Sequence, residues 1–308
     1  MKIFTLTLNP AYDVHAVCED LALYRENLAE IRSREAGGKG VNISRALHSA
    51  GVENTAVIVL GKDNAADFVG ELHRFGLDSI LLEKEGRIRE NLTIHCQNGQ
   101  ETRISFSGFR IGEAVLDEVT ELLGDVKDCV VTFTGRIPKG IGVESVKVFL
   151  KKLRDSGAKI VLDSKSFSVA DICDVRPWLI KPNQEEISEY AGCTVETVAQ
   201  AAECGKRLFG GCVENVMISM GDQGALLING EKIYAAVPPA VDVASTIGAG
   251  DSSLAGFMAA FLRGADASSC LRTAVAFGSA ACMCEGSQPP RADSVVDILK
   301  QTVIHEVV

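Results

Sequence analysis

A glycine-rich turn with an aspartate, followed at once by an apolar helix pattern, is the part of the chain best suited to chemistry. Residues 246–251 read Thr-Ile-Gly-Ala-Gly-Asp. The free backbone N–H groups at such a helix start bind anions, and the glycines let the backbone approach a ligand closely. The amides of Gly248, Ala249 and Gly250 are therefore predicted to hold a transferred phosphoryl group. Asp251 would take the proton from an attacking hydroxyl.

A second glycine-rich helix start lies near the N-terminus, where residues 36–42 read Ala-Gly-Gly-Lys-Gly-Val-Asn. Gly38 permits close approach to a polar ligand, and Lys39 adds a point charge suited to a phosphate. Asn42 lies in the same first turn of the predicted helix. The order and spacing of a Walker loop are missing. Because glycines and polar residues also form ordinary turns and caps, phosphate chemistry needs support from other residues.

Two arginines provide such support. The net charge of −10 argues against nucleic acid or an anionic membrane as a partner, so an anionic substrate needs a local group of basic side chains. Arg89 shares a face of a predicted strand with Asn91, although a solvated sheet edge is the alternative. Arg136 follows another predicted strand, and ligands of open α/β sheets bind beyond the C-terminal ends of strands. With Lys39, these arginines form the expected basic cluster.

Polar groups also follow other predicted strands. Asp13 comes after the first strand, and its carboxylate suits hydrogen bonds to sugar hydroxyls. Asn183 and Glu186 are spaced i, i+3 at a helix start, where their oxygens could hold Mg²⁺ directly or through water, or form a capping box. A further predicted strand ends in a turn that contains Ser219, Gly221 and Gly224. This turn could border a nucleotide, and the alternative is an ordinary loop.

Short apolar runs alternate with helical patterns along the chain, which predicts an α/β fold with a mostly parallel sheet covered on both faces. The predicted strands are residues 3–8, 55–60, 129–132, 159–162, 178–180 and 216–219. The predicted helices are residues 41–50, 65–75, 113–123, 144–156, 195–209, 252–262, 267–284 and 295–303. A hairpin is expected at Asn229-Gly230, and a short β-like run at residues 241–243 precedes the second glycine-rich turn.

Two segments, at about residues 12–35 and 87–107, depart from the alternation of strands and helices. Their polar and apolar residues alternate with no helix between them, which predicts extra strands. These strands could form a small second sheet that acts as a lid and excludes water from a reaction. The alternative is an extension of the main sheet at its edge. In either case the chain is predicted to form a single domain over residues 1–308.

The composition is that of a globular protein, with 46% hydrophobic and 23% charged residues. No uncharged apolar run approaches the roughly 18 residues of a membrane helix, and the N-terminus does not resemble a signal peptide. The ten cysteines have no framework spacing, and we expect reduced, mostly buried thiols in a cytoplasmic protein. The pair Cys282-x-Cys284 lacks a second pair of ligands, so no metal site is predicted there.

Taken together, these residues resemble the ribokinase-like sugar kinases of the PfkB family over essentially the whole chain. The matching motifs are Gly-Gly-Lys-Gly at 37–40, Asn-x-x-Glu at 183–186 and Thr-x-Gly-Ala-Gly-Asp at 246–251. The resemblance implies a three-layer α/β/α sandwich with a mostly parallel central sheet and a small β-sheet lid. Stretches such as Thr-Leu-Asn-Pro-Ala-Tyr-Asp at 7–13 and Phe-Ser-Gly-Phe at 106–109 are similar to the branch of the family that acts on phosphosugars.

The resemblance also implies a role for each motif. Asp251 is the implied base, and the amides that precede it form the anion hole. The residues implied for the sugar phosphate are Asp13 for its hydroxyls and Lys39, Asn42 and Arg89 for its phosphate. Those implied for ATP and Mg²⁺ are Lys181, Asn183 and Glu186, with Ser219, Gly221, Gly224 and Thr246 along the nucleotide. A monovalent cation such as K⁺ would bind carbonyl groups near Val243 and residues 284–287.

The implied reaction is the ATP- and Mg²⁺-dependent phosphorylation of fructose 1-phosphate at its 6-hydroxyl, giving fructose 1,6-bisphosphate and ADP. Tagatose 6-phosphate or fructose 6-phosphate is the alternative acceptor, because Arg136 stands where many relatives have a serine. A non-catalytic sensor of sugar phosphate or nucleotide is the alternative from another class, and the presence of Asp251, Asn183 and Glu186 argues against it. We expect a homodimer formed through an exposed apolar face of the lid.

Overall fold

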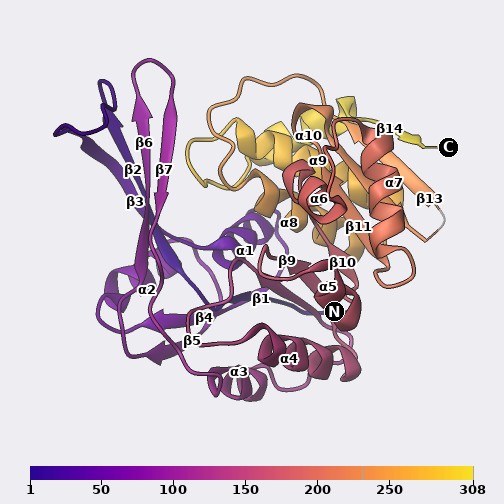
Figure 1. Ribbon diagram of the computed structural model, residues 1–308, viewed down its shortest axis with the longest axis horizontal. Helices are drawn as coiled ribbons and strands as arrows, with labels where there is room; N and C mark the ends of the chain where they lie inside the picture. The colour runs from indigo at the N-terminus through magenta and orange to yellow at the C-terminus, as the bar shows by residue number, and fades with distance from the viewer. Residues whose placement is uncertain (231, 308) are drawn as a thin grey trace.

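A computed structural model describes residues 1–230 and 232–307, and within them a ten-stranded sheet runs through the centre of the molecule (Figure 1). The order of its strands is β14-β13-β12-β11-β10-β9-β8-β1-β4-β5. Every neighbouring pair from β11 to β5 is parallel, and the three pairs from β11 to β14 are antiparallel. The bounds of these strands are β1 Ile3–Thr7, β4 Thr55–Gly61, β5 Ser79–Lys84, β8 Val130–Thr134, β9 Lys159–Asp163, β10 Leu179–Ile180, β11 Asn215–Ser219, β12 Ala225–Asn229, β13 Lys232–Val237 and β14 Val303–Glu306.

Helices pack on both faces of this sheet (Figure 1). One face is covered by α1 (Lys39–Ser49), α2 (Ala65–Arg74), α8 (Ala249–Leu262) and α9 (Ala267–Cys282), with α10 (Ala292–Gln301) packed on α9. The other face is covered by α3 (Val115–Leu123), α4 (Val143–Asp155), α5 (Val169–Val175), α6 (Gln184–Ala191) and α7 (Val198–Phe209). The parallel strands are buried on both faces, as such sheets require. The predicted three-layer α/β/α sandwich is confirmed.

A second, four-stranded sheet stands apart from the sandwich and forms the lid (Figure 1). Its strands are β2 (Ala11–Cys18), β3 (Glu30–Gly37), β6 (Arg89–Cys96) and β7 (Glu101–Ser105), in the order β3-β2-β6-β7. The lid is therefore a separate sheet and not an edge extension of the main one. Asp13 pairs with Asn91, and Thr93 pairs with Arg103. Because side chains alternate along a strand, this register decides which lid residues share a face.

The sequence-based predictions missed three whole elements, β5, α5 and β14, and the other differences are an absent strand and shifted element ends. Residues 241–243 form no strand, because they follow two consecutive prolines and pair with no neighbouring strand. The helix predicted over 195–209 begins at Val198, because Thr197 and Gln200 form a capping box that fixes its start. The helix predicted over 295–303 ends at Gln301, and the next residues form the edge strand β14.

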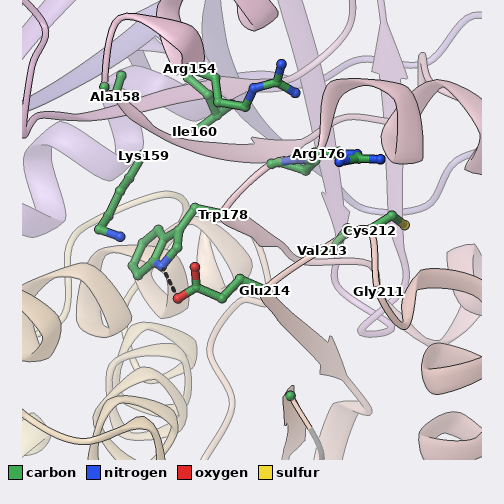
Figure 2. A pocket seen from close by; sticks show the side chains of 13 residues that line it. Arg154, Ala158, Lys159, Ile160, Arg176, Trp178, Gly211, Cys212, Val213 and Glu214 are labelled. Atoms are coloured by element: carbon green, nitrogen blue, oxygen red, sulfur yellow. Dashed lines mark hydrogen bonds between the residues drawn. The ribbon is translucent and has the colours of Figure 1, made fainter.

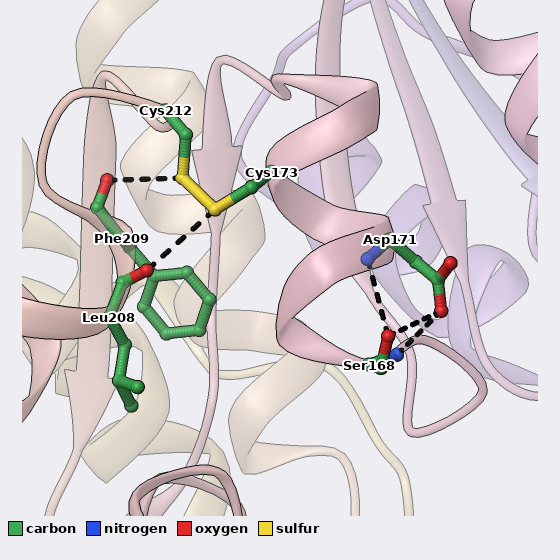
Figure 3. Close-up of a disulfide and its surroundings, with 6 residues drawn as sticks. All are labelled: Ser168, Asp171, Cys173, Leu208, Phe209 and Cys212. Carbon is green, nitrogen blue, oxygen red and sulfur yellow. Dashed lines mark hydrogen bonds between the residues drawn. A yellow bond between two sulfur atoms is a disulfide. The ribbon is translucent and has the colours of Figure 1, made fainter.

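The expectation that all cysteines are reduced is wrong for one pair. Cys173, near the end of α5, forms a disulfide with Cys212 in the segment after α7, where the two Cα atoms lie 5.0 Å apart. The cysteine spacing does not indicate this pair, because its members are 39 positions apart and are brought together by the packing of the helices (Figure 3). The other cysteines in the described ranges are free thiols.

The described residues contain no group of three or more histidine, cysteine or acidic side chains arranged to hold a metal ion. Across residues 1–230 and 232–307, every helix is too short or too polar to span a bilayer.

Candidate active site

A cleft lined by most of the predicted site residues opens where the parallel strands end. From β1 the chain adds β4 and β5 on one side and β8 to β11 on the other, so the order of strands reverses between β1 and β8. Ligands of open α/β sheets bind at such a switch point, beyond the C-terminal ends of the strands. The cleft has a volume of about 600 Å³ and lies between these ends and the lid.

The N-terminus of α8 forms one wall of the cleft. Gly248 is its N-cap, with a φ of 79° that favours glycine, so the chain can turn sharply into the helix. The backbone N–H groups of Gly250 and Asp251 have no acceptor within the described residues. The Lys181 ammonium lies 3.0 Å from the position that a Cβ atom on Gly250 would occupy. Free amides and an ammonium therefore converge at a place suited to a phosphoryl group.

Asp251 lies in the first turn of α8 and is almost fully buried. Asn42 in the first turn of α1 donates a hydrogen bond from Nδ2 to Asp251 Oδ2 at 2.9 Å, so the two predicted glycine-rich helix starts do meet. Burial raises the pKa of Asp251 to about 6, although the nearby Lys39 acts in the opposite direction. A carboxylate with this pKa is ionised at neutral pH and is a stronger base than an exposed aspartate.

Asp163 is a site residue that sequence reasoning missed. It ends β9 and is buried between two lysines, with its Oδ2 atom 2.9 Å from Lys39 Nζ and 3.6 Å from Lys181 Nζ. Burial alone would raise the pKa of Asp163, but the two ammonium groups lower it. Burial would likewise lower the pKa of Lys39, but Asp163 and then Asp251 raise it. Lys39 is thus held in the charged form beside Asp251.

Asp13 lies on the face of the lid that borders the cleft. Its Oδ1 atom accepts hydrogen bonds from Asn91 Nδ2 at 2.9 Å and from Arg103 Nη2 at 3.3 Å. A Cβ atom on Gly37 would lie 2.2 Å from Asp13 Oδ2, so the position of this carboxylate requires a glycine there. Arg103 is the second residue that sequence reasoning missed, because only the pairing of β6 with β7 turns it toward the cleft.

Three arginines gather at the lid end of the cleft, namely Arg89, Arg103 and Arg136. Arg89 donates a hydrogen bond to the carbonyl of Phe106 at 3.0 Å. Burial lowers the pKa of Arg89, Asp13 opposes this, and the positive charges of Arg103 and Arg136 lower the pKa further. The arginines are therefore close enough to repel one another, and an anionic ligand would relieve this repulsion.

The Asn-x-x-Glu motif starts α6. Asn183 Oδ1 accepts from Glu186 N at 2.8 Å, and Glu186 Oε2 accepts from Asn183 N at 2.9 Å. This is the capping box that the sequence allowed as the alternative to a metal site. The second carboxylate oxygen of Glu186 takes no part in it and lies 3.8 Å from Lys165 Nζ.

Most of the predicted residues do come together around the cleft. Those that line it are Asp13, Gly38, Lys39, Asn42, Arg89, Arg136, Lys181, Asn183, Ser219, Thr246, Gly248, Gly250 and Asp251. Those that do not are Glu186, Gly221, Gly224 and Ala249. Position 224 requires a glycine for packing and not for ligand binding, because a Cβ atom there would lie 2.0 Å from the carbonyl oxygen of Ala236.

The fold and the site define a sugar kinase of the ribokinase type, and comparisons with known proteins agree. Residues 8–294 match the family described as pfkB family carbohydrate kinase. The chain therefore belongs to this family, whose members transfer a phosphoryl group to an alcohol.

Two relatives named 1-phosphofructokinase match most of the chain. The 1-phosphofructokinase of Escherichia coli (strain K12) is 32% identical over 91% of this chain and 90% of its own. The 1-phosphofructokinase of Haemophilus influenzae is 33% identical over 85% of each chain. Crystal structures of phosphofructokinase-2 from Escherichia coli, one with potassium and one with substrates and products, have TM-scores of 0.89 and 0.90. Both are 25% identical and cover 97% of this chain and 98% and 99% of theirs.

Proposed function

We propose that the protein transfers the γ-phosphoryl group of ATP to the 6-hydroxyl of fructose 1-phosphate, giving fructose 1,6-bisphosphate and ADP. One observation carries this proposal: Asp251 and the free amides of α8 share a cleft with three lid-end arginines. A ligand that fits both ends has a hydroxyl group at one end and an anionic group at the other. A ketohexose that already carries a phosphate has this form, and similarity to 1-phosphofructokinases favours fructose 1-phosphate.

In the proposed reaction, Asp251 accepts the proton of the sugar hydroxyl as it attacks. The free amides of Gly250 and Asp251, with that of Gly248, stabilise the negative charge that spreads over the transferred group. Lys39 and Lys181 flank that position, because both contact Asp163 beside Asp251.

The contacts in the cleft favour a change in two of the roles that the sequence suggested. Lys39 and Asn42 were expected to hold the phosphate already on the sugar. Their contacts with Asp163 and Asp251 favour a place at the reacting end instead. We therefore assign the sugar phosphate to the three arginines and the sugar hydroxyls to Asp13, whose carboxylate accepts hydrogen bonds.

The oxygen groups at the start of α6 fit a hydrated Mg²⁺ ion. This ion prefers carboxylate oxygens and water, and Glu186 has one carboxylate oxygen outside its capping box. When bound, Mg²⁺ neutralises charge on the ATP phosphates. Asn183 and Glu186 would hold it through water, while Ser219 and Thr246 border the nucleotide.

We also propose a K⁺ site between the segments around Val243 and residues 284–287. The N–H groups of Ala244 and Ser245 donate to the carbonyl of Cys282 at 2.8 and 3.2 Å, so these segments lie side by side. Their proximity places several backbone carbonyls near the start of α8. The phosphofructokinase-2 structure with potassium supports the same choice of ion.

The function is tested by initial rates on fructose 1-phosphate, tagatose 6-phosphate and fructose 6-phosphate at a fixed ATP concentration. We expect the highest kcat/KM for fructose 1-phosphate. A higher value for either of the other acceptors would replace the proposed substrate. If none of the three accepted a phosphoryl group, the sensor alternative would be favoured.

Replacing Arg103 with glutamine should raise the KM for fructose 1-phosphate by roughly 10–100-fold and change kcat little. The reason is that the variant loses a charge-assisted hydrogen bond to the phosphate but leaves the reacting end intact. Steady-state kinetics measure this split. The matched control is Arg74→Gln on α2, whose exposed side chain pairs with Glu71 far from the cleft and should leave both constants unchanged. An unchanged KM in the Arg103 variant would remove this residue from the phosphate site.

We propose that the lid mediates a homodimer. Several large apolar side chains of the lid and its connections are exposed, namely Leu23, Tyr24, Leu28, Ile31, Ile104 and Phe106. An apolar face of this kind is typical of an interface, and a second copy of the same lid matches it in size and chemistry. Sedimentation velocity at micromolar concentration should show a dimer, and Leu28→Glu should convert it to a monomer. A monomeric wild-type protein would contradict the proposal.

A further inference from the structure

The lid is joined to the sandwich by a closed ring of hydrogen bonds among three side chains. Glu35 lies on β3, Arg45 on α1, and Gln288 in the segment that follows α9. Arg45 donates from Nη1 to Glu35 Oε2 at 3.2 Å and from Nη2 to Gln288 Oε1 at 3.0 Å. Gln288 Nε2 donates to the other carboxylate oxygen of Glu35, which closes the ring. We call these three residues the lid anchor.

The lid anchor lies beside Asp13, the residue to which the sugar hydroxyls are assigned. Asp13 and Glu35 are paired across β2 and β3, so both carboxylates project from the same face of the lid. Burial lowers the pKa of Arg45, whereas the charges of Glu35 and then Asp13 act in the opposite direction. The guanidinium of Arg45 therefore contacts one of these carboxylates and lies close to the other.

The opposite face of the lid packs on α2. Tyr12 donates a hydrogen bond to the carbonyl of Asn64 at 2.7 Å, and its ring meets that of Phe68 edge to face, with 5.4 Å between the ring centres. Apolar packing is not directional, so it does not by itself fix the angle of the lid over the cleft. The hydrogen bonds of the lid anchor are directional, and they act on the face that borders the ligand.

The segment that supplies Gln288 contacts the lid at a second point. A Cβ atom on Gly286 would lie 3.0 Å from His15 Nε2, so the imidazole of His15 packs against the backbone there. His15 Nδ1 is hydrogen-bonded to His95 Nε2 on β6 at 2.9 Å. Strands β2 and β3 therefore both meet this segment, which supports the lid from the sandwich side.

Arg45 also connects the lid to the reacting end of the cleft. It lies on α1 one turn after Asn42, which donates a hydrogen bond to Asp251. The side chain of Arg45 is only 3% exposed, and its guanidinium stacks on Phe75 at 3.8 Å from the ring centre. The same helix thus holds the partner of the proposed base and a buried cation that is bonded to the lid.

We propose that Glu35, Arg45 and Gln288 are positioning residues that hold the lid at the angle at which Asp13 and the lid-end arginines meet the sugar phosphate. A buried, fully bonded polar network accepts a narrow range of geometries. Loss of one member lowers the fraction of molecules with the lid in this position, which weakens apparent affinity by the same factor. The identity of the ligand rests on the function proposed above, but the role of the lid anchor in holding the lid does not.

Gln288→Met tests the proposal, because it keeps the length of the side chain, removes both of its hydrogen bonds and leaves the ion pair of Arg45 with Glu35 in place. The KM for the preferred phosphosugar should rise roughly 3–30-fold, while kcat and the KM for ATP should stay within about twofold. Glu35→Gln weakens the lid anchor from the lid side and should change the same constant. This second variant keeps the test decisive if one of the two does not fold.

Hydrogen exchange of the ligand-free protein separates a positioning role from a local structural one. In Gln288→Met, the backbone amides of β2 and β3 should exchange at least about threefold faster, although the substitution lies on the sandwich side. The amides of β8 and β9 should exchange as in the wild type. A local role would speed exchange only in the segment around residue 288.

Two control variants make the same replacements elsewhere. Gln301→Met changes an exposed side chain on α10. Glu214→Gln removes a carboxylate that accepts a hydrogen bond from Trp178 Nε1 at 3.1 Å, at the end of β11 opposite the cleft (Figure 2). Both should leave the KM for the phosphosugar and the exchange of the lid unchanged.

The proposal is overturned if the lid of Gln288→Met exchanges as in the wild type, or if the KM for the phosphosugar does not rise. Should the protein accept none of the three phosphosugars, the function proposed above fails. Faster exchange of the lid in the ligand-free variant would then still support the lid anchor, so the two failures are distinguishable.

Discussion

Asp251→Asn is expected to lower kcat by roughly 10²–10⁴-fold, because the variant has no group that accepts the proton of the attacking hydroxyl. Asparagine keeps the shape of the side chain and can still accept the hydrogen bond from Asn42, so the fold should be retained. Steady-state rates together with circular dichroism measure both effects. Near-normal turnover by a folded variant would show that Asp251 is not the base.

The pH dependence of the wild-type protein provides the corresponding control. Asp251 must be ionised to act as a base, and its pKa is raised to about 6. The kcat should therefore fall as the pH decreases through about 6, and it should be constant on the neutral side. An acid limb near pH 4 would instead indicate a base with an ordinary carboxyl pKa.

The same substitution should stabilise the fold. A carboxyl group whose pKa is raised by folding favours the folded state only below its unfolded pKa, and this contribution is lost as the pH rises through the folded value. At pH 8, ionised Asp251 therefore costs roughly 2–3 kcal/mol that neutral asparagine avoids. Urea unfolding should show a gain of this size at pH 8 and a smaller gain at pH 5. No gain at either pH would contradict the raised pKa.

Asp163→Asn should have the second large effect, a loss of about 2–4 kcal/mol in the free energy of unfolding at pH 7. The variant leaves Lys39 and Lys181 close together without the carboxylate that compensates both charges, and the charge of Lys181 is buried. The pKa of Asp163 is lowered in the folded protein, so its contribution is present at neutral pH and lost only in acid. Urea unfolding measures the change.

A matched control for Asp163 is Asp297→Asn, which removes a carboxylate from an exposed ion pair with Lys300. Exposed pairs of this kind contribute little, so this variant should stay within about 0.5 kcal/mol of the wild type. If the two variants lost the same small amount, the interpretation of Asp163 as a buried link between two lysines would be wrong.

The parts of the fold that could be predicted from the sequence are those that local chemistry determines. The alternation of strands and helices and the extra strands of the lid follow from apolar periodicity and from glycines at helix ends, but the separation of the lid from the main sheet was left open. The two glycine-rich helix starts were also predictable, because each combines backbone freedom with a ligand-binding side chain. The structure places them in contact through Asn42 and Asp251.

The residues that could not be predicted depend on distant partners. Asp163 is one acid at a strand end, and its importance comes from Lys39, which lies 124 positions away. Arg103 reaches the cleft only because β7 pairs with β6 in one register. The run at 241–243 has β-like residues but no strand beside it, so its local preference did not decide its structure. The positions of these residues therefore depend on contacts between distant parts of the chain, which a local sequence pattern does not reveal.

Two of the connections between the lid and the sandwich lie beside the cleft, one from β1 to β2 and the other from β3 to α1. β2 follows β1 after three residues, β3 runs through Gly38 into α1, and Ala11 pairs with Gly37 between them. Asp13 and Lys39 therefore lie on either side of this connection, and with the roles proposed above a sugar phosphate would contact both walls of the cleft. ATP alone would leave the lid side of the cleft open to water, because no sugar would contact Asp13 and the arginines there. This geometry favours transfer to sugar over hydrolysis of the nucleotide.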